Sequence, residues 1–166
     1  YQSRLALGQQ RQVLEAIEQE IGSFIEANTW KDLCQQWLAL ADDHGELPIS
    51  IQAVGSEWRR GFDIDVVGID EENKTLVLGS CQWDGPGSVE AIEKLLQHTT
   101  SVVPRQEEWT IYYLGFAANG WSPGERLRAE AALTNRAKRG RAQWNFAGLR
   151  LLDLEEVDRD LVRWQV

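Results

Sequence analysis

Two short segments carry polar side chains at spacings that could support phosphodiester chemistry. Asp63 and Asp65 alternate with apolar residues in one strand-like run, and Ser80 and Gln82 alternate in the next. A polar loop separates the two runs, so the sequence predicts adjacent antiparallel strands. Opposed residues of such strands are near neighbours, and we expect Asp65, Ser80 and Gln82 to share one cross-strand neighbourhood. In two-metal nucleases, groups at such positions hold Mg²⁺ and orient the attacking water. The alternative is that Asp63 and Asp65 are only the solvated face of a strand.

Positive charge is concentrated in one part of the chain. The 17 Lys and Arg residues face 26 Asp and Glu residues, which gives a net charge of −9 with neutral histidine. The segment from Arg126 to Arg141 holds six basic residues and one acid, so it carries +5 and the remainder −14. This segment could bind phosphate groups, and Arg59 and Arg60 form a second, smaller basic cluster in the sequence. A solvated helix end, where cations suit the helix dipole, explains it about as well. The nucleic-acid-binding candidates are Arg59, Arg60, Arg136, Lys138, Arg139 and Arg141.

The few cysteine and histidine residues argue against thiol or zinc chemistry. Cys34 and Cys81 are too few for a disulfide framework, and neither has the spacing of a metal ligand. They are predicted to be buried, reduced thiols of a cytosolic protein. His44 and His98 have no ligand partner nearby in the sequence and are predicted to be surface or helix-end residues.

Hydrophobic periodicity predicts a single α/β domain in which helices and strands position these groups. Capping residues at Ser88, Ser122 and Asp153 predict where three of the helices begin. Helices are predicted over about 5–22, 29–45, 122–138 and 153–162, and a further helix begins at Ser88 with Val89, Ile92, Leu95 and Leu96 on one face. Strands are predicted over 49–58, 62–69, 75–83, 110–116 and 149–152. The first two strand connections are short, so those strands are expected to be antiparallel. A helical crossover then predicts a parallel neighbour, and hence a mixed sheet with helices on both faces.

Composition and motifs exclude several classes of protein. The chain has 166 residues and is 43% hydrophobic, which suits one globular domain. No apolar run of about 18 residues occurs, so no membrane-spanning segment is predicted. No glycine-rich phosphate-binding loop ending in Lys-Ser or Lys-Thr is present. The sequence begins at Tyr1 and contains no methionine, which we interpret as a piece of a longer protein.

Three stretches together resemble a known family. They are Val54 to Trp58, Asp63 to Val67 and Leu78 to Trp83. They look like the PD-(D/E)XK nuclease-like domain at the C-terminus of archaeal-type P-loop ATPases, and the likeness extends over about residues 22–153. The resemblance implies a restriction-endonuclease-like αβββαβ core. It also implies a single domain over 1–166, with a helical N-terminal part at about 5–45 and a core at about 46–153. An ATPase domain would precede it.

The sequence departs from the family at the residues that matter most for cleavage. Asp65 fills the family's aspartate position, but Ser80 stands where the family has glutamate and Gln82 where it has lysine. The family's acid on the first helix would fall near Lys31. A hydroxyl cannot replace a carboxylate as a ligand of a hard cation, so Mg²⁺ binding at Asp65 is expected to be weak. Asp63 and Asp84 are the candidate substitutes.

The predicted function is therefore a catalytically inactive, cytoplasmic module used for DNA binding or regulation. Its expected partners are its own N-terminal ATPase domain and DNA, without contact to a membrane. No cofactor is expected in this segment, and the resemblance implies ATP only for the upstream domain. Two alternatives stay open: an active Mg²⁺-dependent DNA endonuclease with a rearranged site, and a protein-interaction domain without nucleic-acid contact.

Overall fold

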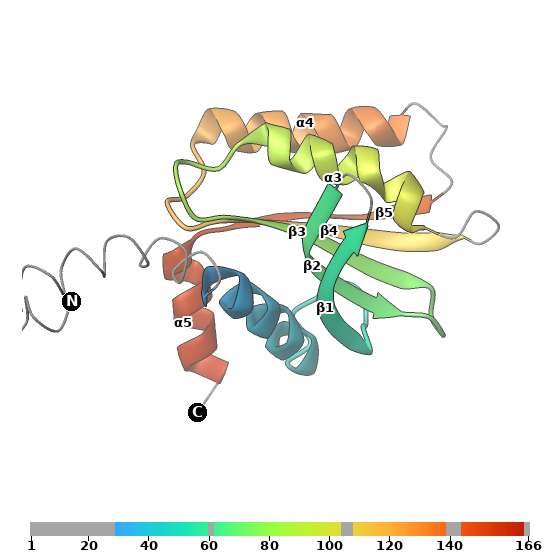
Figure 1. Ribbon diagram of the computed structural model, residues 1–166, viewed down its shortest axis with the longest axis horizontal. Helices are drawn as coiled ribbons and strands as arrows, with labels where there is room; N and C mark the ends of the chain where they lie inside the picture. Colours follow the sequence, from blue (N-terminus) through green and yellow to red (C-terminus); the bar gives the residue numbers. More distant parts are fainter. Residues whose placement is uncertain (1–28, 60–61, 104–107, 139–143, 165–166) are drawn as a thin grey trace, which may run out of the picture.

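The computed structural model describes residues 29–59, 62–103, 108–138 and 144–164 (Figure 1). The helix predicted over 5–22 lies outside these residues. A helix over residues 29–43 is followed by β1 (Ala53–Arg59), β2 (Phe62–Asp70), β3 (Thr75–Gln82), α3 (Val89–Val102), β4 (Trp109–Ala117), α4 (Pro123–Lys138), β5 (Trp144–Leu152) and α5 (Leu154–Trp164). Among the described helices, none has the length and apolar character that crossing a bilayer requires.

The described strands form one mixed sheet in the order β1-β2-β3-β4-β5. β1, β2 and β3 pair antiparallel, because the connections between them are short. β3, β4 and β5 pair parallel, because each connection contains a helix that carries the chain back across the sheet. The predicted mixed α/β architecture is confirmed in this coarse form, with four described helices flanking five strands.

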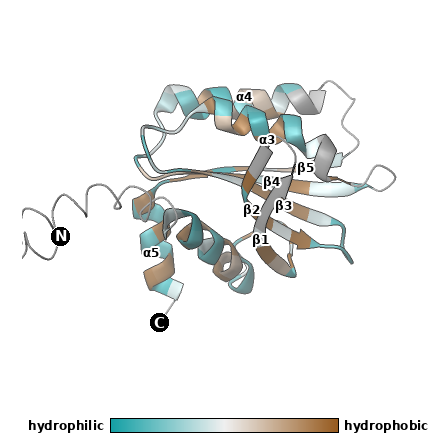
Figure 2. Ribbon diagram, in the orientation of Figure 1, coloured by the Kyte–Doolittle hydropathy of each residue, from teal (hydrophilic) through white to brown (hydrophobic). Residues whose placement is uncertain are grey.

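α3 and α4 cover one face of the sheet (Figure 1). Ile92, Leu95 and Leu96 of α3 pack there against Leu76 and Leu78 of β3. We call this cluster of buried side chains the α3/α4 layer. Two successive parallel crossovers of the same hand place both helices on the same face, which is why this layer contains both. Figure 2 shows both hydrophobic and hydrophilic residues along α4, and Ala129, Ala132 and Leu133 of this helix pack in the α3/α4 layer.

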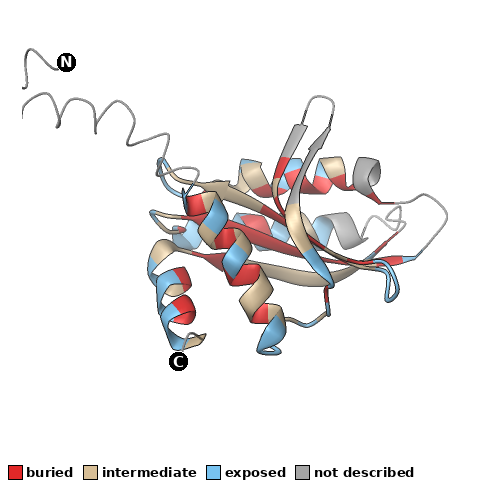
Figure 3. Cartoon of the chain, turned by 60° about the horizontal axis from the view of Figure 1, so that its bottom comes forward, coloured by how far each residue is buried: buried red, intermediate tan, exposed pale blue. Residues whose placement is uncertain are grey.

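The helix over 29–43 and α5 cover the other face (Figure 1). Trp30, Cys34 and Trp37 pack there with Val77 of β3 and Leu161 of α5, and we call this cluster the α5 layer. β4 lies between the two layers, and eight of its nine residues are buried. The prediction of a strand buried on both faces is confirmed, and the buried residues run along the middle of the sheet in Figure 3.

The predicted capping residues begin three helices. The Ser88 hydroxyl accepts a hydrogen bond from the Glu90 amide at 3.2 Å, at the start of α3. Ser122 accepts from the amide of Glu125 at 3.2 Å, before α4. Asp153 accepts from the amide of Glu156 at 2.8 Å, before α5. Each side chain satisfies an amide that the helix itself cannot, so these starts could be predicted from residue type and spacing alone.

Two strand starts differ from the prediction by several residues. β1 begins at Ala53 rather than at Ile49, and β5 spans Trp144–Leu152 rather than only 149–152. Ile111 pairs with Phe146 but Tyr112 pairs with Gly148, so β5 carries an extra residue at this point. Gly148 has a φ of +139°, a conformation that side chains disfavour. This bulge interrupts the alternation of side chains along β5. The sequence pattern therefore predicts only the second half of the strand.

Gly115 allows β4 to lie close to side chains of the α3/α4 layer. A Cβ atom there would lie 2.7 Å from Leu151 Cδ2, 2.8 Å from Trp121 Cζ2 and 3.0 Å from Ile92 Cδ1. We therefore expect Gly115→Ala to lower the free energy of unfolding by about 1–2 kcal/mol through overpacking, measured by urea denaturation.

Gly124→Ala provides the matched control. Its Cβ would meet no atom within 4 Å, and it lies in the first turn of α4. The substitution should leave stability unchanged or raise it by roughly 0.5–1 kcal/mol through helix propensity. Equal losses in the two variants would contradict the packing described for Gly115.

Candidate functional site

Asp65 lies at an irregularity in β2 that turns its side chain toward the α5 layer. Gly55 of β1 pairs with Val67, whereas Glu57 pairs with Ile64, so two residues of β2, Asp65 and Val66, oppose one residue of β1. The side chains on either side show the effect, because Ile64 belongs to the α3/α4 layer and Val66 to the α5 layer. A bulge of this kind redirects a side chain relative to strict alternation.

The Asp65 carboxylate holds together three parts of the domain. Its Oδ2 accepts a hydrogen bond from the backbone amide of Cys81 at 2.8 Å, in place of a carbonyl of the β2–β3 ladder. Its Oδ1 lies 3.7 Å from Nζ of Lys31, and both side chains are about a quarter exposed. The Asp65 backbone carbonyl accepts from Nε2 of Gln35 at 3.0 Å. Asp65 thus links β2 to β3 and to the helix over 29–43.

Ser80 and Gln82 lie on the opposite face from Asp65. Gln82 Oε1 accepts a hydrogen bond from the Ser88 amide at 3.0 Å, before the start of α3. Ser80 pairs with Gly115 in the β3–β4 register, under the α3/α4 layer, and its buried Oγ has no hydrogen-bond partner among the described residues. The expectation of one shared neighbourhood for the three side chains is therefore wrong. Strict alternation placed Asp65 on their face, and the bulge in β2 moves it to the other.

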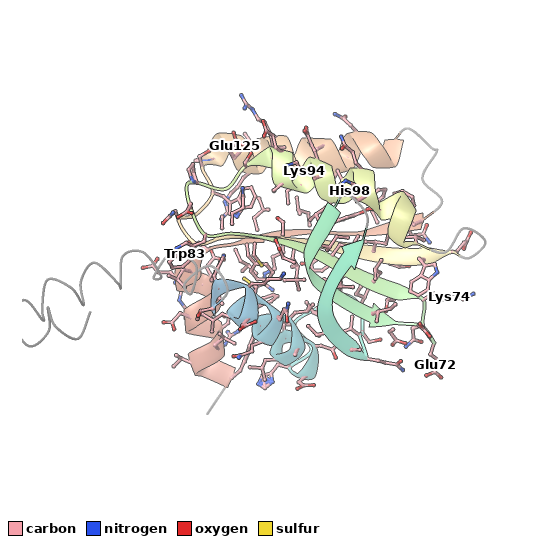
Figure 4. The ribbon with its side chains drawn as sticks, viewed as in Figure 1. Glu72, Lys74, Trp83, Lys94, His98 and Glu125 are labelled. Atoms are coloured by element: carbon pink, nitrogen blue, oxygen red, sulfur yellow. The ribbon has the colours of Figure 1, made fainter. Side chains whose placement is uncertain are left out.

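The candidate substitutes do not assemble a second acidic centre in the part of the chain that the structure describes. Asp84 is exposed and follows β3, just after Trp83. Figure 4 shows Trp83 at the end of the sheet near the helix over 29–43, with Glu72 and Lys74 at the opposite end. Asp63 lies in β2 opposite Trp58, but its side chain is outside the description. No group of three or more His, Cys, Asp or Glu side chains suited to a metal occurs among the described residues.

The basic candidates fall largely outside what the structure describes. Arg60, Arg139 and Arg141 lie in undescribed segments, and the side chains of Arg59, Arg136 and Lys138 are undescribed within their elements. The described part of the basic segment has acidic partners. Arg126 Nη2 lies 3.9 Å from Glu156 Oε1, and Arg128 Nη1 lies 3.4 Å from Glu125 Oε1. The +5 that the sequence assigns to this segment is thus partly offset by neighbouring acids.

The two cysteines are neighbours in space, which sequence reasoning missed. Cys34 is fully buried in the α5 layer, and Cys81 is half-buried and packs against the same layer. Burial raises the pKa of the Cys34 thiol, and the adjacent Cys81 and Asp65 raise it further.

Lys31 and Gln35 are the contacts of Asp65 that the sequence did not assign. They are one helical turn apart and flank the apolar stripe formed by Trp30, Cys34 and Trp37. The signal that could have found them is this pair of polar residues at i and i+4 beside a buried stripe. The resemblance had drawn attention to Lys31 only as the place of a missing acid.

The comparisons with known proteins give one finding. A family model, DUF234, described as archaeal and bacterial proteins of unknown function, matches residues 1–95 of the 166. No curated protein and no solved structure matches the chain. The matched segment contains Lys31, Asp65, Ser80 and Gln82, but not β4, α4, β5 or α5.

Proposed function

We propose that this chain, which belongs to the DUF234 family of archaeal and bacterial proteins of unknown function, is a nuclease-like domain that does not cleave nucleic acid and instead regulates a partner. The order of its elements supports the nuclease-like part of the proposal. A helix, three antiparallel strands, a crossover helix and a parallel strand follow one another, as in the αβββαβ core that the sequence motifs resemble. We also propose that the protein is cytoplasmic.

The environment of Asp65 is the observation that carries the proposal. Hard cations such as Mg²⁺ bind to several oxygen ligands, with carboxylates supplying the charge. The Asp65 carboxylate already has a backbone donor in Cys81 and a positive partner in Lys31. An ammonium group therefore provides locally the positive charge that a metal would supply in a working nuclease.

The groups at the other motif positions give this site no further charge. Ser80 is a hydroxyl and Gln82 an amide, and both face the α3/α4 layer. Gln82 is engaged with the start of α3 and serves as a structural acceptor there. Among the described residues, no group of three or more His, Cys, Asp or Glu side chains could hold a metal to activate a water, and the lysine next to Asp65, Lys31, is paired with its carboxylate.

A protein partner is favoured over DNA by the charge. The chain carries −9 overall, and Arg126 and Arg128 are paired with acids. A phosphate backbone is bound by unpaired cations, and its binding weakens as they are neutralised. We propose as the partner a P-loop ATPase domain encoded in the same reading frame, where ATP binding would take place. Mg²⁺ has no catalytic role in the segment described here.

A cleavage assay tests the loss of nuclease activity. We expect supercoiled plasmid and linear duplex DNA to stay intact in the presence of Mg²⁺ or Mn²⁺, with the same result for the wild type and for Asp65→Asn. Asp158→Asn is the matched control, since Asp158 is an exposed acid of α5 that no candidate site includes. Metal-dependent nicking that disappears in Asp65→Asn, with circular dichroism unchanged, would establish the active endonuclease instead.

A binding assay separates the two kinds of partner. We expect no retention of a labelled DNA duplex in low salt, and we expect the domain to bind the ATPase segment of its own reading frame and change its ATP turnover. DNA binding that falls with added salt and is lost when Arg136, Arg139 and Arg141 are replaced by alanine would overturn the choice of a protein partner.

A further inference from the structure

Asn119 and Gly120 are the only asparagine-glycine pair in the sequence, and they lie in the loop between β4 and α4. An asparagine before glycine is prone to lose its side-chain amide, because glycine has no side chain to keep its backbone nitrogen away from the asparagine carboxamide. The Asn119 residue is exposed, so water can reach it. This loop therefore has the residue pair and the exposure that deamidation requires.

The Asn119 side chain joins its own loop to the loop between β3 and α3. Its Nδ2 donates to the backbone carbonyls of Trp83 and Gly85, each at 3.2 Å. Trp83 marks this end of the sheet in Figure 4. Both hydrogen bonds use amide hydrogens, which a carboxylate lacks. An aspartate at this position would lose both bonds and would place a negative charge against two carbonyl oxygens.

The backbone of the same loop contacts the segments before two further helices. The Gly120 carbonyl accepts a hydrogen bond from the Gly87 amide at 2.8 Å, shortly before α3. The Ala118 carbonyl accepts from the Leu154 amide at 3.4 Å, at the first residue of α5. Gly120 has a φ of +87°, which side chains disfavour. The loop that leads into α4 is thus also joined to the beginnings of α3 and α5.

One hydrogen bond of the folded chain opposes the reaction. The Gly120 amide nitrogen, which must attack the Asn119 carboxamide, donates to the Ala117 carbonyl at 3.0 Å. This turn has to open before the attack. Exposed loops open locally at a small part of the free energy of global unfolding, and both side-chain bonds of Asn119 are exposed. We therefore expect deamidation to proceed in the folded protein, but more slowly than in the unfolded chain.

We propose that Asn119 is a site of spontaneous deamidation, and that its conversion to an acid loosens the joint between the loops. The Gly120 nitrogen gives up its proton and attacks Cγ of Asn119, and the new C–N bond closes a five-membered succinimide. The side-chain nitrogen takes up a proton and leaves as ammonia. Water then opens the ring at either carbonyl and gives aspartate or isoaspartate. No electrons are transferred, and water is the only co-reactant. This modification does not depend on the proposed function.

Both products change the joint. Isoaspartate carries the backbone through the side-chain carbon, so the chain gains one carbon before Gly120 and displaces the carbonyl that Gly87 contacts. Aspartate keeps the backbone but brings the charge described above. We expect Asn119→Asp to melt roughly 2–4 °C lower than Asn119→Ala, which loses the same two donors without adding a charge. The difference should shrink below about pH 4, where the carboxylate takes up a proton.

Peptide mapping of the whole 166-residue chain tests the proposal. The folded protein is incubated for several weeks in mildly alkaline buffer, and a second sample is incubated in urea. We expect the peptide that contains Asn119 to show the mass of the acid in both samples, with faster conversion in urea. A methyltransferase specific for isoaspartate should label the same peptide. Asn73 and Asn135 are controls within the same molecule, because both are exposed and neither precedes glycine.

Two results would overturn the proposal. An Asn119 that stays intact in the folded protein while it converts in urea would show that the turn does not open far enough for the attack. Conversion of Asn119 no faster than that of Asn73 and Asn135 would show that the pair with Gly120 is not special. An Asn119→Asp variant as stable as Asn119→Ala would refute the loosening of the joint. The wild-type protein decides whether the site reacts even if a variant fails to fold.

Discussion

Replacing Trp37 by alanine is expected to lower the free energy of unfolding by about 3–5 kcal/mol, the loss typical of a large aromatic side chain removed from a core. The Trp37 side chain is fully buried, and its ring lies 5.7 Å from Phe116 of β4 and 5.8 Å from Trp164 of α5. Its indole N–H donates to Asp160 Oδ2 at 3.0 Å, and the Arg150 guanidinium lies 5.0 Å from the ring centroid. Trp37 therefore joins the sheet and α5. Urea denaturation followed by circular dichroism measures the loss.

Further variants distinguish the contribution of the buried Trp37 ring to stability from that of its hydrogen bond. Trp37→Phe keeps most of the buried surface but removes the donor to Asp160, whose Oδ1 keeps Arg163 at 3.2 Å. We expect this variant to lose about 1–2 kcal/mol. Leu127→Ala, at a side chain that is 67% exposed, should change stability by less than about 0.5 kcal/mol. A Trp37→Ala variant no less stable than Trp37→Phe would contradict the placement of α5 against this ring.

Asp65→Ala should give the second-largest loss, about 2–3 kcal/mol of unfolding free energy, because it removes a charged acceptor from a backbone amide. The Cys81 amide would lose its partner at 2.8 Å, and Lys31 would lose its counter-ion. Asp65→Asn keeps an oxygen acceptor and should lose less. Urea denaturation measures both variants, and hydrogen exchange at the Cys81 amide reports the local effect, which we expect to be faster exchange in Asp65→Ala.

The direction of the change distinguishes a structural aspartate from a catalytic one. Catalytic residues often lower the stability of the folded protein, and a variant that lacks one is then as stable as the wild type or more stable. We expect the opposite at Asp65, with Asp84→Ala as the control at an exposed acid. A gain of stability in Asp65→Asn would argue that the carboxylate is held for chemistry, and would weaken the proposed function.

Much of the fold was predictable because local rules agree with the tertiary structure. Ser88 and Asp153 cap helices in the way that their side-chain oxygens favour. The apolar stripe that includes Trp30 and Trp37 became one side of the α5 layer, as the spacing predicted. The continuous apolar run of β4 became the strand buried on both faces. In each case a residue's own type and its near neighbours in sequence determine the outcome.

The candidate site was predictable only in part, because its geometry depends on contacts between distant segments. Asp65 could be singled out, but its orientation depends on a bulge that the β1–β2 pairing creates. The contact between Lys31 and Asp65 joins a helix and a strand 34 positions apart. The pattern of the helix could single out Lys31, but it does not indicate Asp65 as the partner. The packing of Cys34 and Cys81 in the same α5 layer also joins distant segments. The resemblance to nucleases identified the motif positions, but it could not predict on which face of the sheet each side chain lies.

The place of β4 in the sheet has a consequence for dissecting this protein. The family match ends at residue 95, in the middle of α3 and before β4 begins. A fragment ending there would leave β3 without its parallel neighbour and would leave both buried faces of the sheet uncovered where Ile111 and Leu114 now pack. The limit of sequence similarity is therefore not a limit of autonomous folding. We expect such a fragment to be degraded rapidly by protease, while the whole domain resists.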